Sequence, residues 1–169
     1  GSLQSIFENG KIQQIRTKGG SPDNPDAPVK GGDIIKLRNG YHGSIRSYMG
    51  WFNDDYITIE PQQGHSPTLG AFWFREDAAK WIIRGLNISP SYRYEGATDV
   101  FIIGCRYGNC EDFIIENNNI FSVDNSKVES WTKEAMGENF STGIKFYINN
   151  GLVRNNNIFN VQTGIYAGG

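Results

Sequence analysis

The stretches FIIENNNIF at residues 113–121 and LVRNNNIF at residues 152–159 decide the fold, because they are two copies of one unit. The copies align with Asn117 on Asn155, and a weaker third copy, WIIRGLNIS at 81–89, fits the same register. Each copy has a short apolar run, a corner of Asn or Gly that tolerates left-handed backbone, and a second apolar pair. The unit is therefore a strand, a tight corner and a second strand.

The alignment of the three copies predicts columns of equivalent side chains in a parallel stack. The predicted columns are an inward aliphatic column of Ile83, Ile115 and Val153, an asparagine ladder of Asn87, Asn119 and Asn157, and an outward charged column of Arg84, Glu116 and Arg154. The first two columns have structural roles. The third is typical of a surface ladder of alternating charge.

Further short apolar runs lie between the copies, at 71–74, 100–103, 144–147 and 165–166. They predict a rung of three strands, which at the C-terminal end are 143–147, 151–155 and 157–161, with the next rung starting at Gly164. Successive first strands cannot be hairpin partners, so the ladder is parallel. No apolar pattern of helical period runs for three turns. The predicted fold is all-β, a right-handed parallel β-helix of about five rungs.

Three motifs in the first half, GDIIKLRNGY at 32–41, YITIEP at 56–61 and WIIRGLNI at 81–88, carry a family resemblance. Their succession resembles the N-terminal rungs of the pectin-lyase-like superfamily, most closely polysaccharide lyases of the alginate lyase and chondroitinase B type. The resemblance covers roughly residues 28–169 and is informative for fold rather than for activity.

The resemblance implies a secreted or cell-surface protein, periplasmic in a Gram-negative bacterium, that acts on an acidic polysaccharide by β-elimination, often with calcium. In that family the catalytic Lys and Arg and the acidic calcium ligands come from later rungs. We therefore expect this chain alone to be inactive and to need no cofactor, with calcium reserved for a full-length protein.

The domain organisation follows from the repeat. Residues 1–27 are expected to be an N-terminal extension or cap, and residues 28–169 form the rungs, with a long inserted loop at 123–141. The chain begins a new first strand at 165–166 and then stops. We expect either a piece of a longer solenoid or a C-terminal rung that self-associates with another subunit, because open stacks need caps.

Candidate catalytic residues lie on the predicted first strands. With Ile144 and Phe146 inward, alternation turns Lys145 and Tyr147 outward, and Tyr166 lies one rung above Lys145. β-Elimination needs a base, a cation beside the sugar carboxylate and a proton donor, and a Lys with a Tyr supplies such groups. The alternatives are an ordinary surface pair and sugar stacking on the tyrosines.

Substrate-binding candidates are Tyr166, Trp73, Arg75, Arg154 and Trp131. Trp73 and Arg75 share the outward face only if Phe72 and Phe74 point inward, and the opposite parity stays open at this stage. Trp131 belongs to the long loop, and long loops in repeat proteins often wall a binding face.

The remaining features argue against other classes of site. The oxygen ligands Asp112, Glu116, Asp124 and Glu129 show no dedicated calcium loop, so no metal is predicted. Cys105 and Cys110 are five positions apart across a Gly-containing turn and form a structural pair, bridged or reduced.

Charge and hydropathy narrow the list of partners. The net charge of −2 with scattered basic residues gives no footprint for nucleic acid. No apolar run has the length of a membrane span. The expected partner is a polysaccharide, bound by a lyase-like protein, by a non-catalytic carbohydrate-binding or adhesion β-helix, or not at all if the stack is purely structural.

Overall fold

A computed structural model of the chain describes residues 1–92, 101–128, 132 and 140–168. Its helical segments are α1 (Leu3–Glu8), a 3-10 turn at Pro90–Tyr92 and α2 (Asn125–Val128). Its strands are β1 (Ile34–Leu37), β2 (Gly40–Tyr41), β3 (Ile45–Ser47), β4 (Trp51–Pro61), β5 (Pro67–Leu69), β6 (Phe72–Phe74), β7 (Ala78–Arg84), β8 (Asn87–Ile88), β9 (Phe101–Glu116), β10 (Asn119–Phe121), β11 (Thr142–Asn149), β12 (Leu152–Arg154), β13 (Asn157–Phe159) and β14 (Ile165–Ala167). No helix among the described residues is long and apolar enough to cross a membrane.

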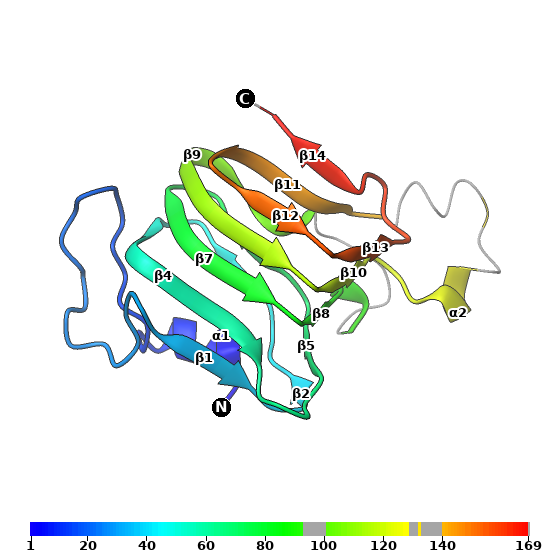
Figure 1. Cartoon of the computed structure of the whole chain (residues 1–169), viewed down its shortest axis with the longest axis horizontal. Helices are drawn as coiled ribbons and strands as arrows, with labels where there is room; N and C mark the ends of the chain where they lie inside the picture. The colour runs from blue at the N-terminus through cyan, green and yellow to red at the C-terminus, as the bar shows by residue number, and fades with distance from the viewer. Residues whose placement is uncertain (93–100, 129–131, 133–139, 169) are drawn as a thin grey trace.

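The protein is all-β, and the strands listed above pair in parallel within two sheets. The larger sheet has the order β1, β4, β7, β9, β11 and β14, with β6 also beside β9, β3 beside β6, and β12 beside the end of β9. The smaller sheet has the order β2, β5, β8, β10 and β13. Each pass of the chain thus adds strands next to those of the previous pass (Figure 1).

The predicted register is confirmed at the repeat. Ile83 pairs with Ile115, which pairs with Val153. Ile83 and Ile115 are fully buried, and Val153 packs against the core. In the smaller sheet Asn119 pairs with both Asn87 and Asn157. The inward column and the asparagine column therefore have the register that the repeat predicted.

Two strands expected to be separate are one in the structure. The apolar run at 100–103 and the repeat unit at 113–121 were predicted as different strands, but β9 runs without interruption from Phe101 to Glu116. The equivalent corners Lys80 and Asp112 are single residues with left-handed backbone, at φ 57° and 56°. A one-residue corner bends the strand without ending its ladder, so the first and second strands of a rung share a sheet.

A second asparagine column, inside the corner, holds the rungs together. The side chain of Asn118 is buried; its Nδ2 donates to the carbonyl of Ile83 at 2.9 Å, and its Oδ1 accepts from the N–H of Leu86 at 3.0 Å. Asn156 repeats the first bond one rung further on, to the carbonyl of Ile115 at 2.8 Å. Side-chain amides thus replace ladder bonds that the corner removes. An outer ladder runs beside them, with Asn119 donating to Asn87 at 2.9 Å.

The core is rich in aromatic rings. Trp81 is fully buried between Ile57 and Phe113 of the neighbouring strands, and its ring stacks on Phe74 at a centroid distance of 5.4 Å. Phe72 lies edge-on to Trp81 at 5.5 Å. Rings from β6, β7 and β9 of the larger sheet therefore pack against one another inside the stack, as inward positions of a parallel stack require.

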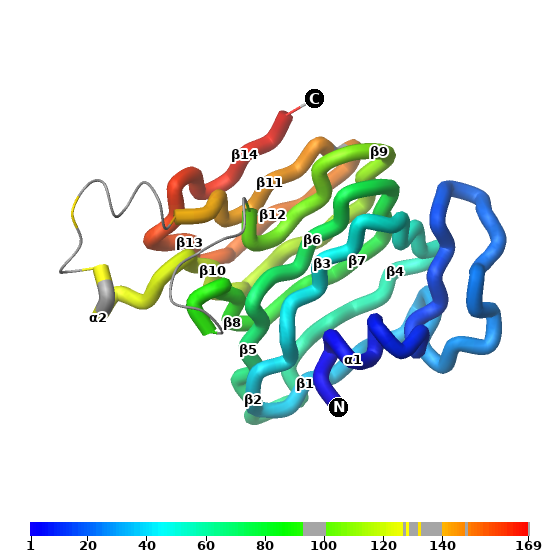
Figure 2. The backbone as a smooth tube through the Cα atoms, turned by 180° about the vertical axis from the view of Figure 1, so that it is seen from behind, coloured from blue at the N-terminus to red at the C-terminus, as the bar shows by residue number. Residues whose placement is uncertain are grey.

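The N-terminal segment covers one end of this core. Phe7 of α1 contacts the rings of Trp51 at 4.7 Å and Trp81 at 5.7 Å, and Leu3 is fully buried. Figures 1 and 2 show α1 beside the first strands of the chain. At the other end, the inward-facing Ile165 of β14 is 52% exposed. The two ends of the stack therefore differ in how their apolar side chains are covered.

Cys105 and Cys110 form a disulfide, with Cα atoms 6.0 Å apart. Both cysteines are buried, and the turn between them carries Arg106 and Tyr107 at the surface. Of the two states considered from the sequence, bridged and reduced, the bridged state is observed.

We expect replacement of both cysteines by serine to lower the free energy of unfolding by about 2 kcal/mol, the value for a loop of this length in the chain-entropy view. Urea unfolding of the two proteins measures the difference. Added reductant should destabilise the wild-type protein and leave the double variant unchanged. Equal stability of both proteins without reductant would show that the bridge contributes nothing.

Candidate functional site

A column of outward side chains crosses the first strands of successive rungs. The pairing of β3, β6, β9, β11 and β14 aligns Arg46, Trp73, Gly104, Lys145 and Tyr166. The inward neighbours confirm the direction: Phe72, Phe74, Ile144 and Phe146 are all buried. This settles the parity that the sequence left open, and places Trp73 on the same outer face as Lys145.

A second outward column lies two residues further along the chain, just past the ends of β3 and β6 and within β9 and β11. It contains Tyr48, Arg75, Arg106 and Tyr147, and Tyr107 lies next to it in the disulfide-bridged turn. We name the two columns together the cation–aromatic face. Its residues are Arg46, Tyr48, Trp73, Arg75, Arg106, Tyr107, Lys145, Tyr147 and Tyr166.

One half of the face is centred on Arg75. Its guanidinium lies 5.6 Å from the ring of Tyr48 and 5.7 Å from the ring of Tyr107. Tyr48 in turn meets Trp73 edge-on at 5.5 Å. Arg106 adds a second guanidinium, 5.0 Å from the Tyr107 ring. Cations in contact with ring faces are attracted by the ring quadrupole, so the charges and rings of this half hold one another in place.

The other half is centred on Lys145. Its Nζ lies 4.9 Å from the ring of Tyr166 and 5.8 Å from that of Tyr147, and the two rings are 6.0 Å apart. The structure therefore brings together Lys145, Tyr147 and Tyr166, the three candidates from the first strands.

Gly104 joins the two halves. A Cβ at this position would overlap the carbonyl of Lys145 on the neighbouring strand, so only glycine fits. The ring of Phe101 lies beside this position and contacts Trp73 at 5.5 Å. No side chain at position 104 therefore separates Trp73 from Lys145.

The charge of the face is one-sided. Its nine residues include Arg46, Arg75, Arg106 and Lys145 and no carboxylate, although the whole chain carries a net charge of −2. Arg75, Arg106 and Lys145 lie against the aromatic rings of this face and favour an anionic ligand there. The sequence did not point to Arg46, Tyr48, Arg106 and Tyr107, because each lies outside the apolar runs at 71–74, 100–103, 144–147 and 165–166 from which the first strands were predicted.

The second strands of the rungs are β1, β4, β7, the C-terminal part of β9 and β12. Their outer face is different, because its charges neutralise one another. Its charged column runs through Lys36, Glu60, Arg84, Glu116 and Arg154. Arg84 reaches Glu60 at 2.6 Å, and Arg154 reaches Glu116 at 2.7 Å. The predicted alternating ladder is therefore present and extends two rungs further toward the N-terminus.

Two substrate-binding candidates do not join the cation–aromatic face. Arg154 lies in the ladder of the second strands and is bonded to the buried Glu116. Trp131, from the loop predicted at 123–141, falls outside the described residues. The described candidates gathered at one place are Lys145, Tyr147 and Tyr166, with Trp73 and Arg75 further along the same face.

Two of the acidic residues considered from the sequence as calcium ligands, Glu116 and Asp124, already bind other side chains. The carboxylate of Glu116 is held by Arg84 and Arg154. Asp124 accepts hydrogen bonds from Ser126, and Glu129 lies outside the described residues. Among residues that the structure describes, no three His, Cys, Asp or Glu side chains gather as a metal site would require.

Comparison with protein families, with curated proteins and with solved structures gave no match. The family resemblance therefore rests on the sequence motifs alone. The chemistry of the cation–aromatic face has to be inferred from its own residues.

Proposed function

We propose that the chain is a right-handed parallel β-helix of the pectin-lyase-like kind, and that its cation–aromatic face binds an acidic polysaccharide. The repeat, the two parallel sheets and the asparagine ladders support the fold. A disulfide of buried cysteines suits a protein that works outside the cytosol, secreted or at the cell surface.

The observation that carries the binding proposal is the combination of four cations and five aromatic rings on one face of the first strands. Aromatic rings cover the apolar faces of sugar rings, and arginine and lysine pair with carboxylate or sulfate groups. An acidic polysaccharide presents both features in every repeat. A neutral glycan would use the rings alone.

A second candidate function is β-elimination at Lys145, because the lysine and the phenol of Tyr147 share one cluster. The contacts of Lys145 are with the faces of the Tyr147 and Tyr166 rings, an arrangement that holds a cation between rings and does not by itself pair the amine with an acid or a base. Binding is therefore the better-supported activity. A lyase assay that follows the ultraviolet absorbance of unsaturated uronates, with Lys145→Ala as control, distinguishes the two; lysine-dependent product would establish catalysis.

Affinity for alginate, pectate and chondroitin sulfate tests the binding proposal, with Arg75→Ala as the probe. We expect this substitution to weaken binding about tenfold, because it removes a charge-assisted contact at the centre of one half of the face. Binding should also weaken as salt is raised, since salt screens exposed charges.

Arg154→Ala is the matched control, because it also removes one positive charge but lies in the ladder of the second strands. We expect its affinity to equal that of the wild type, and its stability to change by about 1 kcal/mol or less, because the side chain is 57% exposed. Equal losses in both variants would mean that net charge, rather than this face, governs binding. Failure to bind any of the three polymers would contradict the binding proposal.

A further inference from the structure

The turn between Cys105 and Cys110, which we name the bridged turn, is an insertion in the stack. Four residues, 106–109, lie between the two cysteines, whereas Tyr147 alone lies between their pairing partners in the next rung. The additional residues bulge out of the ladder, and 107–109 are exposed. Insertions in repeat proteins gather on one face, often the binding face. The position of this one, on the cation–aromatic face, therefore points to a role in binding.

The bridged turn is anchored to the previous rung. The N–H of Tyr107 donates to the carbonyl of Arg75 at 2.9 Å, and the N–H of Asn109 donates to Oδ1 of Asp77 at 2.6 Å. Gly108 has left-handed backbone, at φ 74°, and a Cβ there would overlap the Asp77 carboxylate. The disulfide closes the base of the turn. Asp77 therefore helps to fix the position of Tyr107.

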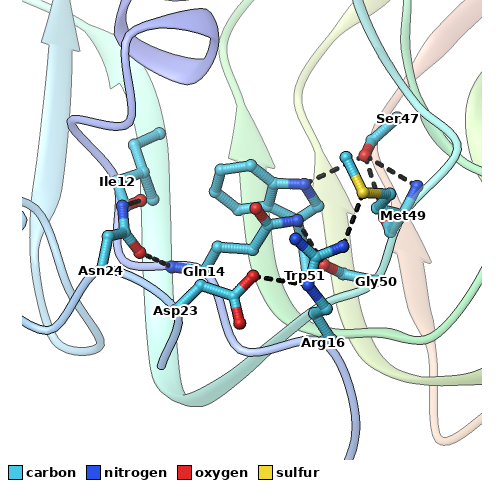
Figure 3. Close-up of polar contacts among 9 residues, drawn as sticks. All are labelled: Ile12, Gln14, Arg16, Asp23, Asn24, Ser47, Met49, Gly50 and Trp51. Atoms are coloured by element: carbon cyan, nitrogen blue, oxygen red, sulfur yellow. Dashed lines mark hydrogen bonds and ion pairs between the residues drawn. The ribbon is translucent and has the colours of Figure 1, made fainter. Parts of the chain in front are cut away.

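The other side of Arg75 is also fixed. Its N–H donates to the carbonyl of Ser47 at 2.7 Å. The hydroxyl oxygen of Ser47 accepts from the indole N–H of Trp51 at 3.0 Å and from the N–H of Met49 at 3.2 Å (Figure 3). Tyr48, whose ring contacts Arg75 at 5.6 Å, lies in the short segment that these bonds hold. Arg75 thus has an aromatic ring from a fixed segment in each neighbouring rung.

The bridged turn places a second guanidinium near that of Arg75. Arg75 and Arg106 lie 5.7 Å and 5.0 Å from the ring centre of Tyr107. In the described part of the chain, neither arginine forms an ion pair with Asp or Glu. Guanidinium N–H groups form a fork that matches the oxygens of an anionic group. Two such forks near one partly exposed ring can bind an acidic sugar through its charge and its apolar surface.

We infer that the bridged turn completes a subsite for one acidic sugar of the polymer; this inference rests on the proposed function. The carboxylate or sulfate group of that sugar binds to Arg75 and Arg106. The sugar ring lies against Tyr107, which is 48% exposed. Asp77 does not touch the sugar. It holds the turn through the N–H of Asn109 and is therefore a positioning residue.

Calorimetric titration of Asp77→Ala with oligogalacturonate, oligoalginate and chondroitin sulfate oligosaccharides tests this inference through the sign of the change. On charge alone, loss of a carboxylate near the arginines should strengthen binding of an anion. Loss of the anchor of the turn should weaken it, and we expect about fivefold weaker binding. Asp77→Asn keeps the Oδ1 acceptor, so it should restore the wild-type affinity.

Asp33→Ala is the matched control. The carboxylate of Asp33 also accepts a backbone N–H, that of Lys30 at 2.8 Å, but it lies in the loop before β1 rather than beside the bridged turn. We expect this variant to bind with the wild-type affinity. A loss equal to that of Asp77→Ala would overturn the inference.

A second arm asks whether Asp77 acts through the turn. The variant Arg106→Ala, Tyr107→Ala should bind about tenfold more weakly than the wild type, and adding Asp77→Ala to it should cause no further loss. Wild-type or tighter binding by Asp77→Ala alone, or the same loss in both backgrounds, would overturn the inference. The proposed function would then still stand if Arg75→Ala weakens binding. Failure of the folded wild type to bind any of the oligosaccharides would overturn both.

Discussion

Replacement of Trp81 by alanine is expected to lower the free energy of unfolding by about 3–5 kcal/mol, the range for deleting a large aromatic side chain from a core. Trp81 is fully buried and contacts the rings of Phe7, Phe72 and Phe74. Its loss therefore affects both the packing of the core and the contact between the core and α1. Urea unfolding followed by circular dichroism gives the difference.

Trp73→Ala is the matched control for this prediction. Trp73 lies on the outer face of β6, partly exposed, with contacts to Tyr48 and Phe101. We expect its removal to cost about 1 kcal/mol, because little core packing is lost, while affinity for the polysaccharide falls. Equal destabilisation by both substitutions would contradict the assignment of inward and outward positions.

The second large effect is expected at Asn118, where alanine should lower the free energy of unfolding by about 2–4 kcal/mol. The substitution removes the partners of the Leu86 N–H and the Ile83 carbonyl inside the corner, and each unpaired buried group costs about 1–3 kcal/mol. The same urea experiment measures the change.

Asn119→Ala provides the comparison, because Asn119 is the next residue, lies in the outer ladder and is exposed. Water replaces the lost hydrogen bond there, so we expect a change below about 1 kcal/mol. If Asn119→Ala were as damaging as Asn118→Ala, the outer ladder rather than the buried one would be holding the rungs together.

The sequence predicts the part of the fold that repeats. Asn119 and Asn157 could be aligned because a parallel stack places equivalent residues next to one another, so similarity along the chain becomes contact in space. The sequence also identified Cys105 and Cys110 as a pair, because only a short turn separates the two residues. The continuity of β9 could not be predicted, because a one-residue corner has no distinct sequence signature.

The candidate site is only partly predictable for a related reason. Lys145, Tyr147 and Tyr166 were found by alternation beside clearly apolar neighbours. The run at 71–74 is apolar at every position, so only its pairing with β9 shows that Trp73 faces outward. Arg46 and Arg106 lie outside the apolar runs from which the first strands were predicted, so the sequence pattern alone does not relate them to Lys145. Their shared face depends on strand register, which local pattern does not contain.

A titration of the ¹⁵N-labelled protein with an acidic oligosaccharide, followed by NMR, tests the proposed binding face most directly. We expect shifts for the Trp73 indole N–H and for backbone amides of β6, β11 and β14. The Trp81 indole and the amides of β12, which carries Arg154, should stay in place. Shifts centred on β12 and the charged column of the second strands, or none at all from folded protein, would contradict the account.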